Sequence, residues 1–382
     1  MKKALIFDTH NNYTIRTSYI QKALIQHGYE VKIFVSDFSH MQKKYIEEKK
    51  KDFIYLHAEK YEKNLSVQRM HSYARFAKDC VQKAEEEPDV SLIYVIVPPN
   101  SMVKHFAKYK KRHSEVKVWF DVFDMWPETL PVGAKIKKIA APILNQWRYV
   151  RDSYMDCADL ITAECQMFQE ELQKHTSHPI QTLRLCQKEE RIPSFACSLQ
   201  KEIRFLYCGS INNIIDIDLI VNFLSSLATR RSVFLEIIGG GEQKDSLLQK
   251  LQEVQIPYTY HGFVYDAEKK ASIYCRDHFG LNIMKESVFV GLTMKSLDYM
   301  KYGLPLINTI QGDTWKAVHE EQIGLNIQNR TILDVVDSLL HMTDEQYEQY
   351  CKNVHSYFNT ALEEKVFQKN VDTILSKWEE QE

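Results

Sequence analysis

Lys295 and Asp298 have the residue types and the spacing to bind a phosphorylated sugar. They lie one helical turn apart at the start of a short amphipathic segment, which is followed by Gly303-Leu-Pro305 and an apolar run. Side chains three residues apart share one face of a helix. An ammonium and the free N–H groups of a helix N-terminus bind an anion together, while an aspartate accepts hydrogen bonds from hydroxyls. The pair suits a nucleotide sugar, although a solvated lysine beside an ordinary first-turn aspartate fits the same spacing.

Glycines and a hydroxyl lie in loops that follow predicted strands of the second half. Gly239-Gly-Gly241 follows the apolar run 234–238, and Gly209-Ser210 ends the first strand of this half. Glycines after a buried strand let a ligand approach the backbone. A tight strand-to-helix turn needs glycine for its own geometry, so the functional and the structural interpretation are equally good.

A third loop in this half, 291–294, offers backbone N–H groups and the Thr293 hydroxyl to a phosphate.

In the first half, Asp124 and Glu128 lie in the segment Trp119-Phe-Asp-Val-Phe-Asp-Met-Trp-Pro-Glu, directly after a predicted strand. Ligands of parallel α/β sheets bind at the carboxyl ends of the strands. Asp124 is therefore placed to orient or deprotonate an acceptor hydroxyl, or only to hydrogen-bond its own turn. The loop after the first strand, from His10 to Tyr13, carries small polar side chains that suit an acceptor or a capped turn.

These residues need a scaffold that brings strand ends together, and short apolar runs alternating with helix-length amphipathic segments predict one. The runs are 4–7, 31–35, 53–56, 92–97, 116–120 and 160–162 in the first half, and 203–208, 233–238, 258–260, 280–283, 304–307 and 325–327 in the second. Continuous hydrophobicity is typical of strands buried on both faces, so parallel sheets under helices are expected. The pattern occurs twice, which indicates two doubly wound α/β domains.

Size and composition exclude several classes of protein. A length of 382 residues suits two domains, and a net charge of −2 with mixed signs gives no nucleic-acid footprint. Eight scattered cysteines without a Cys-x-x-Cys pair indicate reduced thiols rather than a disulfide frame or a zinc site. The first strand is too short for a signal peptide, and no apolar run could span a bilayer.

Two segments, 104–113 and 135–151, are both basic and aromatic. In the second, Ile139, Ile143 and Trp147 fall on one helical face with Arg148 and Arg151 off it, and Pro142 is expected to break or start the helix. Basic charge beside Trp and Ile suits an anionic membrane surface. A helix that packs on the first domain with a solvated basic face explains the pattern as well.

The segment from Lys295 to Pro305 resembles the donor-site motif of GT-B glycosyltransferases, in particular the retaining family-4 group that builds bacterial surface polysaccharides. Members carry a Glu-x7-Glu element followed by Gly-x-Pro. Asp298 matches the second acid, and Lys295 matches a lysine that one branch places three residues earlier. Asp124 and Glu128 match the Asp-Leu-Trp-Pro-Glu of such transferases. The resemblance is strongest at 116–131, 154–172, 233–242 and 291–327.

Three positions depart from the family pattern. Ser210 stands where the family has an arginine, and Ile215-Asp216 stand where it has Lys-Gly, so both usual diphosphate-binding cations are missing. Val290 stands in place of the first acid. We hypothesise that Lys295 takes over the cationic role. The same losses also fit a catalytically inert GT-B-like scaffold that partners an active glycosyltransferase, and a sugar-nucleotide epimerase or another GT-B enzyme is a third possibility.

The resemblance implies an α/β protein of GT-B fold, with two Rossmann-like domains facing an interdomain cleft and a C-terminal helix crossing back to the N-terminal domain. The expected domains are 1–185 for the acceptor, 200–355 for the donor, and the helix at 356–382. The expected activity is that of a metal-independent, retaining hexosyltransferase. It would move a sugar from a nucleotide-diphosphate donor, most simply a UDP-sugar, to a glycan or lipid-linked acceptor in surface polysaccharide synthesis.

We expect no cofactor, no metal and no nucleic-acid partner, and a cytoplasmic location, peripheral at the inner face of the cell membrane. Asp124 is the expected catalytic residue. The expected donor-binding residues are Gly209, Ser210, Gly239, Gly241, Thr293, Lys295, Ser296 and Asp298. The expected acceptor-binding residues are His10, Asn11, Asn12 and Glu128.

Overall fold

The computed structural model describes residues 2–9, 14–40, 42–63, 66–130, 134–189, 198–199 and 201–380. The side chains of residues 14 and 134–137 also fall outside this description. His10, Asn11 and Asn12, predicted to bind the acceptor, therefore lie outside the described residues, as does the neighbouring Tyr13. The chain divides into two compact units: unit 1 is Met1–Arg184 with Phe367–Glu382, and unit 2 is Leu185–Val366.

Unit 1 is built on a parallel sheet of seven strands in the order β5-β2-β1-β6-β7-β8-β9. Its strands are β1 (Lys2–Asp8), β2 (Tyr29–Ser36), β5 (Phe53–Leu56), β6 (Val90–Val97), β7 (Lys117–Val122), β8 (Leu160–Ala163) and β9 (Ile180–Thr182). Its helices are α1 (Thr14–Gln26), α2 (Val67–Glu86), α3 (Asn100–Arg112), α4 (Ala134–Met155), α5 (Gln166–Leu172) and α13 (Glu364–Glu379). A small hairpin pairs β3 (Phe38–Ser39) with β4 (Lys44–Tyr45).

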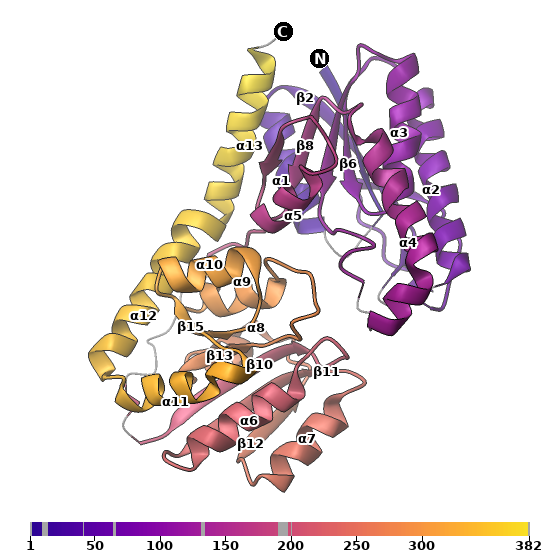
Figure 1. The fold of residues 1–382 in the computed structure, drawn as a ribbon. Helices are drawn as coiled ribbons and strands as arrows, with labels where there is room; N and C mark the ends of the chain where they lie inside the picture. Colours follow the sequence, from indigo (N-terminus) through magenta and orange to yellow (C-terminus); the bar gives the residue numbers. More distant parts are fainter. Residues whose placement is uncertain are drawn as a thin grey trace. The chain divides into compact units, whose positions relative to one another are not determined.

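Helices α2, α3 and α4 pack side by side (Figure 1). The apolar runs at 4–7, 92–97 and 116–120 coincide with β1, β6 and β7, and these central strands are buried on both faces, as the continuous hydrophobicity predicts. The strand β9 and the β3–β4 hairpin have no long apolar run, and the sequence pattern did not reveal them.

A buried ion pair joins the first helix to the middle of this sheet. Arg16 of α1 binds Asp121 of β7 through both carboxylate oxygens, at 2.6 Å from Nε and 2.8 Å from Nη2. Asp121 also accepts hydrogen bonds from Tyr94 and from the Thr162 hydroxyl, the latter at 2.7 Å. Arg16 Nη2 donates to the carbonyl oxygen of Leu183 at 2.8 Å, so one buried cation ties α1, β7 and the chain leaving β9 together.

The helix α13 returns to unit 1 after the chain has built unit 2. Its Trp378 ring packs edge-on against Trp119 at 6.4 Å, and its Glu379 lies 3.2 Å from Nδ1 of His27 at the end of α1. The prediction that a C-terminal helix crosses back to the N-terminal domain is confirmed. The predicted start at 356 differs from the observed change of unit at Phe367, because α12 and the π-helical turn after it belong to unit 2.

Unit 2 is built on a second parallel sheet, of six strands in the order β12-β11-β10-β13-β14-β15 (Figure 1). Its strands are β10 (Ile203–Ser210), β11 (Val233–Gly240), β12 (Tyr258–Gly262), β13 (Phe279–Asn282), β14 (Leu306–Asn308) and β15 (Gly324–Asn326). Its helices are α6 (Ile217–Ala228), α7 (Lys244–Glu253), α8 (Ala267–Tyr274), α9 (Met294–Lys301), α10 (Gly312–Glu320), η1 (Asn329–Thr331), α11 (Ile332–His341), α12 (Asp344–Tyr357) and the π-helical η2 (Phe358–Leu362).

The strand order of unit 2 creates one topological switch point. From β10 the chain moves outward through β11 to β12, then returns to the other side of β10 and continues through β13, β14 and β15. Connections on either side of β10 and β13 therefore leave the sheet in opposite directions, and such points are where open α/β sheets bind ligands. The prediction of two doubly wound parallel-sheet units is confirmed.

In the part of the chain that the structure describes, no helix is both long and apolar enough to cross a membrane. The seven cysteines in this part are all free thiols, as predicted, and most are buried.

Candidate functional site

The helix α9, which carries Lys295 and Asp298, is fixed at the switch point of unit 2. The Tyr299 hydroxyl accepts a hydrogen bond from the backbone N–H of Cys208 at 2.8 Å and donates to the carbonyl of Leu281 at 3.3 Å, so it joins β10 to β13. Gly280 leaves room for that ring, since a Cβ at this position would lie 2.5 Å from it. The position of α9 is therefore set by backbone contacts to two neighbouring strands.

The glycines at the carboxyl ends of β10 and β11 are required by the backbone itself. Gly239 has φ +121°, and a Cβ there would lie 2.0 Å from the carbonyl oxygen of Gly209. Gly241 has φ +151°, and its Cβ would lie 2.3 Å from the carbonyl oxygen of Ile211. The structural interpretation of these glycines is thus correct, because only glycine fits. It does not conflict with a ligand role, since the same close packing leaves bare backbone at the edge of the sheet.

Lys295 lies over this bare backbone. A Cβ built on Gly209 would touch its Cδ at 3.6 Å, and its ammonium is 5.1 Å from the centre of the Tyr207 ring. The Nζ atom is buried and has no hydrogen-bond partner among the described residues. Burial lowers the pKa of Lys295 from 10.5 to about 8. A buried ammonium without a partner is costly, so the geometry calls for an anion at this point.

Asp298 is engaged differently. Its Oδ2 forms a 2.8 Å ion pair with Nζ of Lys270 on α8, and its Oδ1 accepts a 2.9 Å hydrogen bond from Gln187. Lys295 and Asp298 share the helix, but each meets its own set of neighbours. No sequence pattern pointed to Lys270 or Gln187, since both contacts exist only once α8 and the chain before β10 fold against α9.

Thr293 and Ser296 hold the start of α9. The Thr293 hydroxyl accepts a 3.1 Å hydrogen bond from the Ser296 N–H, which makes Thr293 the N-cap of the helix. The Ser296 hydroxyl is buried and is 3.0 Å from Nδ2 of Asn282, whose amide continues the network to Asn308. These groups fix the helix N-terminus, and Ser210 is exposed at the end of β10. Direct donor contacts by these three residues remain predictions.

In unit 1, Asp124 lies in the turn after β7 and bonds within that turn. Its Oδ2 accepts a 2.6 Å hydrogen bond from the indole of Trp126, and its Oδ1 accepts one of 2.5 Å from the Thr129 hydroxyl. Burial raises the pKa of Asp124 above its ordinary value. The guanidinium of Arg69 lies 3.9 Å from the Trp126 ring centre. Both carboxylate oxygens have further lone pairs, so a fixed carboxylate with a raised pKa can still accept an acceptor hydroxyl's proton.

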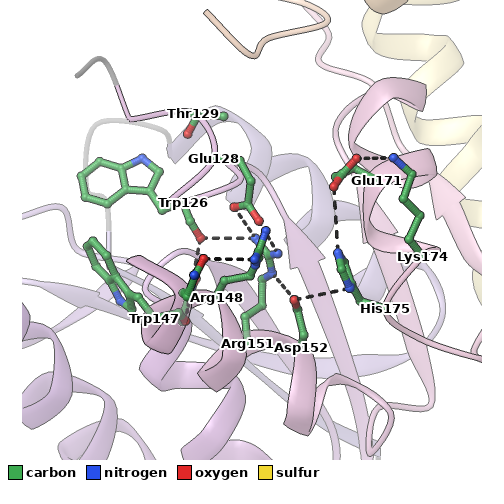
Figure 2. A network of polar contacts seen from close by, with 12 residues as sticks. Trp126, Glu128, Thr129, Trp147, Arg148, Arg151, Asp152, Glu171, Lys174 and His175 are labelled. Carbon is green, nitrogen blue, oxygen red and sulfur yellow. Dashed lines mark hydrogen bonds and ion pairs between the residues drawn. The ribbon is translucent and has the colours of Figure 1, made fainter. Parts of the chain in front are cut away.

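Glu128 binds a buried arginine. Figure 2 shows Arg151 of α4 between Glu128 and Asp152: its Nη1 and Nη2 lie 3.0 and 2.9 Å from the Glu128 oxygens, and its Nε lies 2.8 Å from Asp152. The polar contacts continue through His175, 4.0 Å from Asp152, to Glu171. A bidentate pair of this kind occupies both Glu128 oxygens, so any acceptor contact must use their remaining lone pairs.

Two expectations for α4 were wrong. Arg151 was expected on a solvated basic face, but its side chain is fully buried, because Glu128 and Asp152 neutralise it there. Pro142 was expected to break or start the helix, yet α4 runs through it. Trp147 packs edge-on against Trp126 at 5.6 Å, whereas Ile139 and Ile143 are 83% and 59% exposed. The apolar stripe is thus half-buried at Trp147 and exposed at Ile139 and Ile143.

Among the described residues, no three His, Cys, Asp or Glu side chains lie together in a way that would hold a metal ion.

The fold and the sequence of unit 2 are similar to those of known proteins. Residues 202–345, all of them in unit 2, match the family model described as glycosyl transferases group 1. A search of curated protein sequences gave no match. Among solved structures, sucrose-phosphate synthase from Thermosynechococcus elongatus is similar over 100% of both chains, with a TM-score of 0.75 and 12% identity.

Two further structures share the architecture. The lipopolysaccharide outer core galactosyltransferase WaaB matches 99% of this chain and 100% of its own, at TM-score 0.68 and 14% identity. The Anabaena protein HepE in complex with UDP-glucose matches 99% and 100%, at TM-score 0.63 and 11% identity. At such identities the structures establish the fold, which is GT-B as predicted. The family match supports the prediction of a glycosyltransferase.

Proposed function

We propose that this protein is a glycosyltransferase that takes a sugar from a nucleoside-diphosphate donor held by unit 2 and passes it to a hydroxyl held by unit 1. The donor is a UDP-sugar, and the acceptor is a glycan or a lipid-linked saccharide of a bacterial surface polysaccharide. Support for the donor class comes from the match of residues 202–345 to glycosyl transferases group 1 and from the UDP-glucose bound to HepE.

The observation that carries this proposal is the buried ammonium of Lys295. It has no hydrogen-bond partner in the described chain and lies over the glycine backbone where β10 ends. A diphosphate at this point would neutralise it and would accept hydrogen bonds from the backbone there. The family's usual arginine and lysine are replaced by Ser210 and by Ile215-Asp216, so Lys295 supplies the positive charge that they would have given.

In the reaction, the bond from the anomeric carbon to the diphosphate breaks and a bond to the acceptor oxygen forms. Negative charge accumulates on the leaving diphosphate, and Lys295 stabilises it in a site that is already organised. Asp124 accepts a hydrogen bond from the acceptor hydroxyl and orients it, and the proton of that hydroxyl passes to the departing diphosphate as the new bond forms. Its fixed hydrogen bonds from Trp126 and Thr129 keep the carboxylate in place for that task. In this proposal the reaction needs no bound metal, because Lys295 neutralises the leaving group and Asp124 orients the acceptor. The anomeric configuration of the transferred sugar is retained.

The exposed Ile139 and Ile143 of α4 support a peripheral location at an anionic membrane. This surface would bring a lipid-linked acceptor to unit 1. Arg151 adds nothing to it, because its charge is buried and paired.

The test is release of UDP from a panel of UDP-sugars, measured together with UDP affinity. Wild-type protein should release UDP from at least one donor. Asp124→Asn should lower that rate strongly while UDP affinity stays within about 1 kcal/mol of wild type, since the change is nearly isosteric and lies in the other unit. Binding of UDP without turnover of any donor would favour the inert scaffold, and absence of UDP binding would refute the donor site itself.

A further inference from the structure

A cavity of about 480 Å³ lies in unit 2, away from the candidate donor site. It is formed by α11, α12 and the turn that leads into the edge strand β15. Gln322, on its wall, precedes β15, so the cavity opens at the amino end of that strand. Lys295 and the glycine turns lie at the carboxyl ends of β10 and β11, at the opposite edge of the same parallel sheet. The two sites share no residue.

The floor of the cavity is apolar. Leu325, Met342 and Tyr350 line it, and Met342 belongs to the hydrophobic core of unit 2. Tyr350 is only partly buried, and burial raises the pKa of its hydroxyl. The ring therefore offers a flat apolar face together with one hydroxyl that stays protonated at physiological pH.

The rim consists of amides whose orientation is already fixed. Nε2 of Gln349 donates to Oδ1 of Asn353 at 2.8 Å, Nδ2 of Asn353 donates to the carbonyl of Gln322 at 3.1 Å, and Nε2 of Gln322 donates to the carbonyl of His319 at 2.7 Å. Each bond uses one group and leaves the other end of an amide to a ligand, namely Oε1 of Gln349 and Oε1 of Gln322. One N–H of Asn353 also stays available.

His341 adds a further acceptor to the rim. Its Nδ1 lies 2.8 Å from the carbonyl oxygen of Asp337, so in the neutral ring Nδ1 carries the proton and Nε2 accepts. None of the side chains that line the cavity is a carboxylate, an ammonium or a guanidinium. The cavity therefore offers no cationic side chain that could replace the hydration of a phosphate group, as a nucleotide or a sugar phosphate would require.

We infer that this cavity is a second binding site, for an uncharged saccharide. Each sugar hydroxyl both donates and accepts, which matches a rim of half-used amides, and the C–H face of a sugar ring matches the apolar floor beside Tyr350. The volume falls in the range of about 300–1,000 Å³ that small-molecule sites occupy. The site would hold a neutral part of a glycan without taking part in the reaction, and it does not depend on the proposed donor.

The experiment uses saturation-transfer NMR on the full chain with maltose, cellobiose and lactose as probes. Saturating UDP is added to separate this site from the donor site. At least one of the three should show transfer that UDP does not remove. Gln349→Leu and Asn353→Leu keep the side-chain size but remove the amides, and each should weaken binding at least tenfold.

Lys352→Leu is the matched control, because it changes the exposed face of the same helix, where Lys352 pairs with Glu348. It should leave binding within twofold, and circular dichroism of all three variants should match wild type. The inference is overturned by no transfer from any probe, by transfer that UDP abolishes, or by equal binding in both Leu variants. Tighter binding of glucose 1-phosphate than of maltose would overturn the neutral character of the site.

Discussion

Replacing Lys295 with methionine should raise the stability of the protein and lower its affinity for nucleotide. These two opposite effects test the role of Lys295 most directly. Methionine has nearly the same length and volume as the lysine stem and carries no charge. In the free protein the ammonium is buried without a partner, so its removal relieves a cost. In the proposed complex the ammonium would contact the diphosphate, so its removal would take a contact away.

The size of both effects follows from the structure. Burial lowers the pKa of Lys295 from 10.5 to about 8, and one pKa unit corresponds to about 1.4 kcal/mol. Holding the charged form in the fold at neutral pH therefore costs about 3 kcal/mol. For a domain of the size of unit 2, Tm changes by roughly 2–4 °C per kcal/mol, so a rise of roughly 6–12 °C is expected. Loss of one charge-assisted hydrogen bond weakens nucleotide binding by about 1.5–3 kcal/mol.

Calorimetry gives both quantities on one sample. Scanning calorimetry without ligand measures the change in Tm, and titration with UDP at pH 7 measures the affinity. Lys301→Met is the control, since Lys301 lies in the last turn of the same helix, away from the strand ends. It should leave UDP affinity unchanged, because its ammonium lies 5.1 Å from the Tyr302 ring in the last turn of α9 and not at the helix N-terminus.

The reasoning would be refuted by a Lys295→Met protein that is less stable than wild type and binds UDP equally well. That outcome would mean that the ammonium has a partner that stabilises the fold, and that the diphosphate lies elsewhere. A variant that is more stable but binds UDP equally well would leave Lys295 as a strained residue without a donor role.

Three further predictions concern buried or strained positions in the two units. Because the folded pKa of Lys295 is about 8 and its unfolded value 10.5, the unfolded chain holds more protons between these values. The stability of wild type relative to Lys295→Met should therefore rise from pH 8 to pH 10.5 in denaturant titrations and be constant below pH 8, and a flat difference would contradict the burial of the ammonium. Gly239→Ala should reduce the free energy of unfolding by more than the roughly 1–3 kcal/mol of strain in a left-handed residue, because its Cβ meets the Gly209 carbonyl. Gly262→Ala, with φ +65° and open space around its Cβ, should cost only that strain. Equal losses of unfolding free energy in urea would disprove the clash. Arg16→Met should destabilise the protein by about 3–5 kcal/mol, because it leaves buried Asp121 without its cation. Combining it with Asp121→Asn should recover part of that loss. Additive effects of the two changes on the free energy of unfolding would speak against a coupled pair.

The fold could be predicted because its signal is local. Runs such as 92–97 and 203–208 are continuous and apolar, and each became a central strand. The short β9 and the β3–β4 hairpin were missed because so few residues produce no period.

The candidate site could be proposed from the sequence only where its residues are close in the chain. Lys295 and Asp298 were found from one turn of helix, but Lys270 reaches Asp298 from another helix, and no spacing encodes that contact. The prediction of a solvated Arg151 was wrong for a related reason. A basic residue on an amphipathic helix is normally solvated, and only the fold brings Glu128 to it. The amide-lined cavity depends likewise on three segments that meet in space.

The return of α13 to unit 1 sets the order in which the chain can fold during synthesis. Unit 2 is contiguous from Leu185 to Val366, while unit 1 lacks α13 until residues 367–380 have been made. Until then the Trp119 ring cannot pack against Trp378, and His27 cannot form its contact with Glu379. Domains fold as units while the ribosome elongates the chain. Unit 2 is therefore the first unit that can fold completely. Unit 1 stays incomplete until α13 has been made, so it is the unit that chaperones would need to protect.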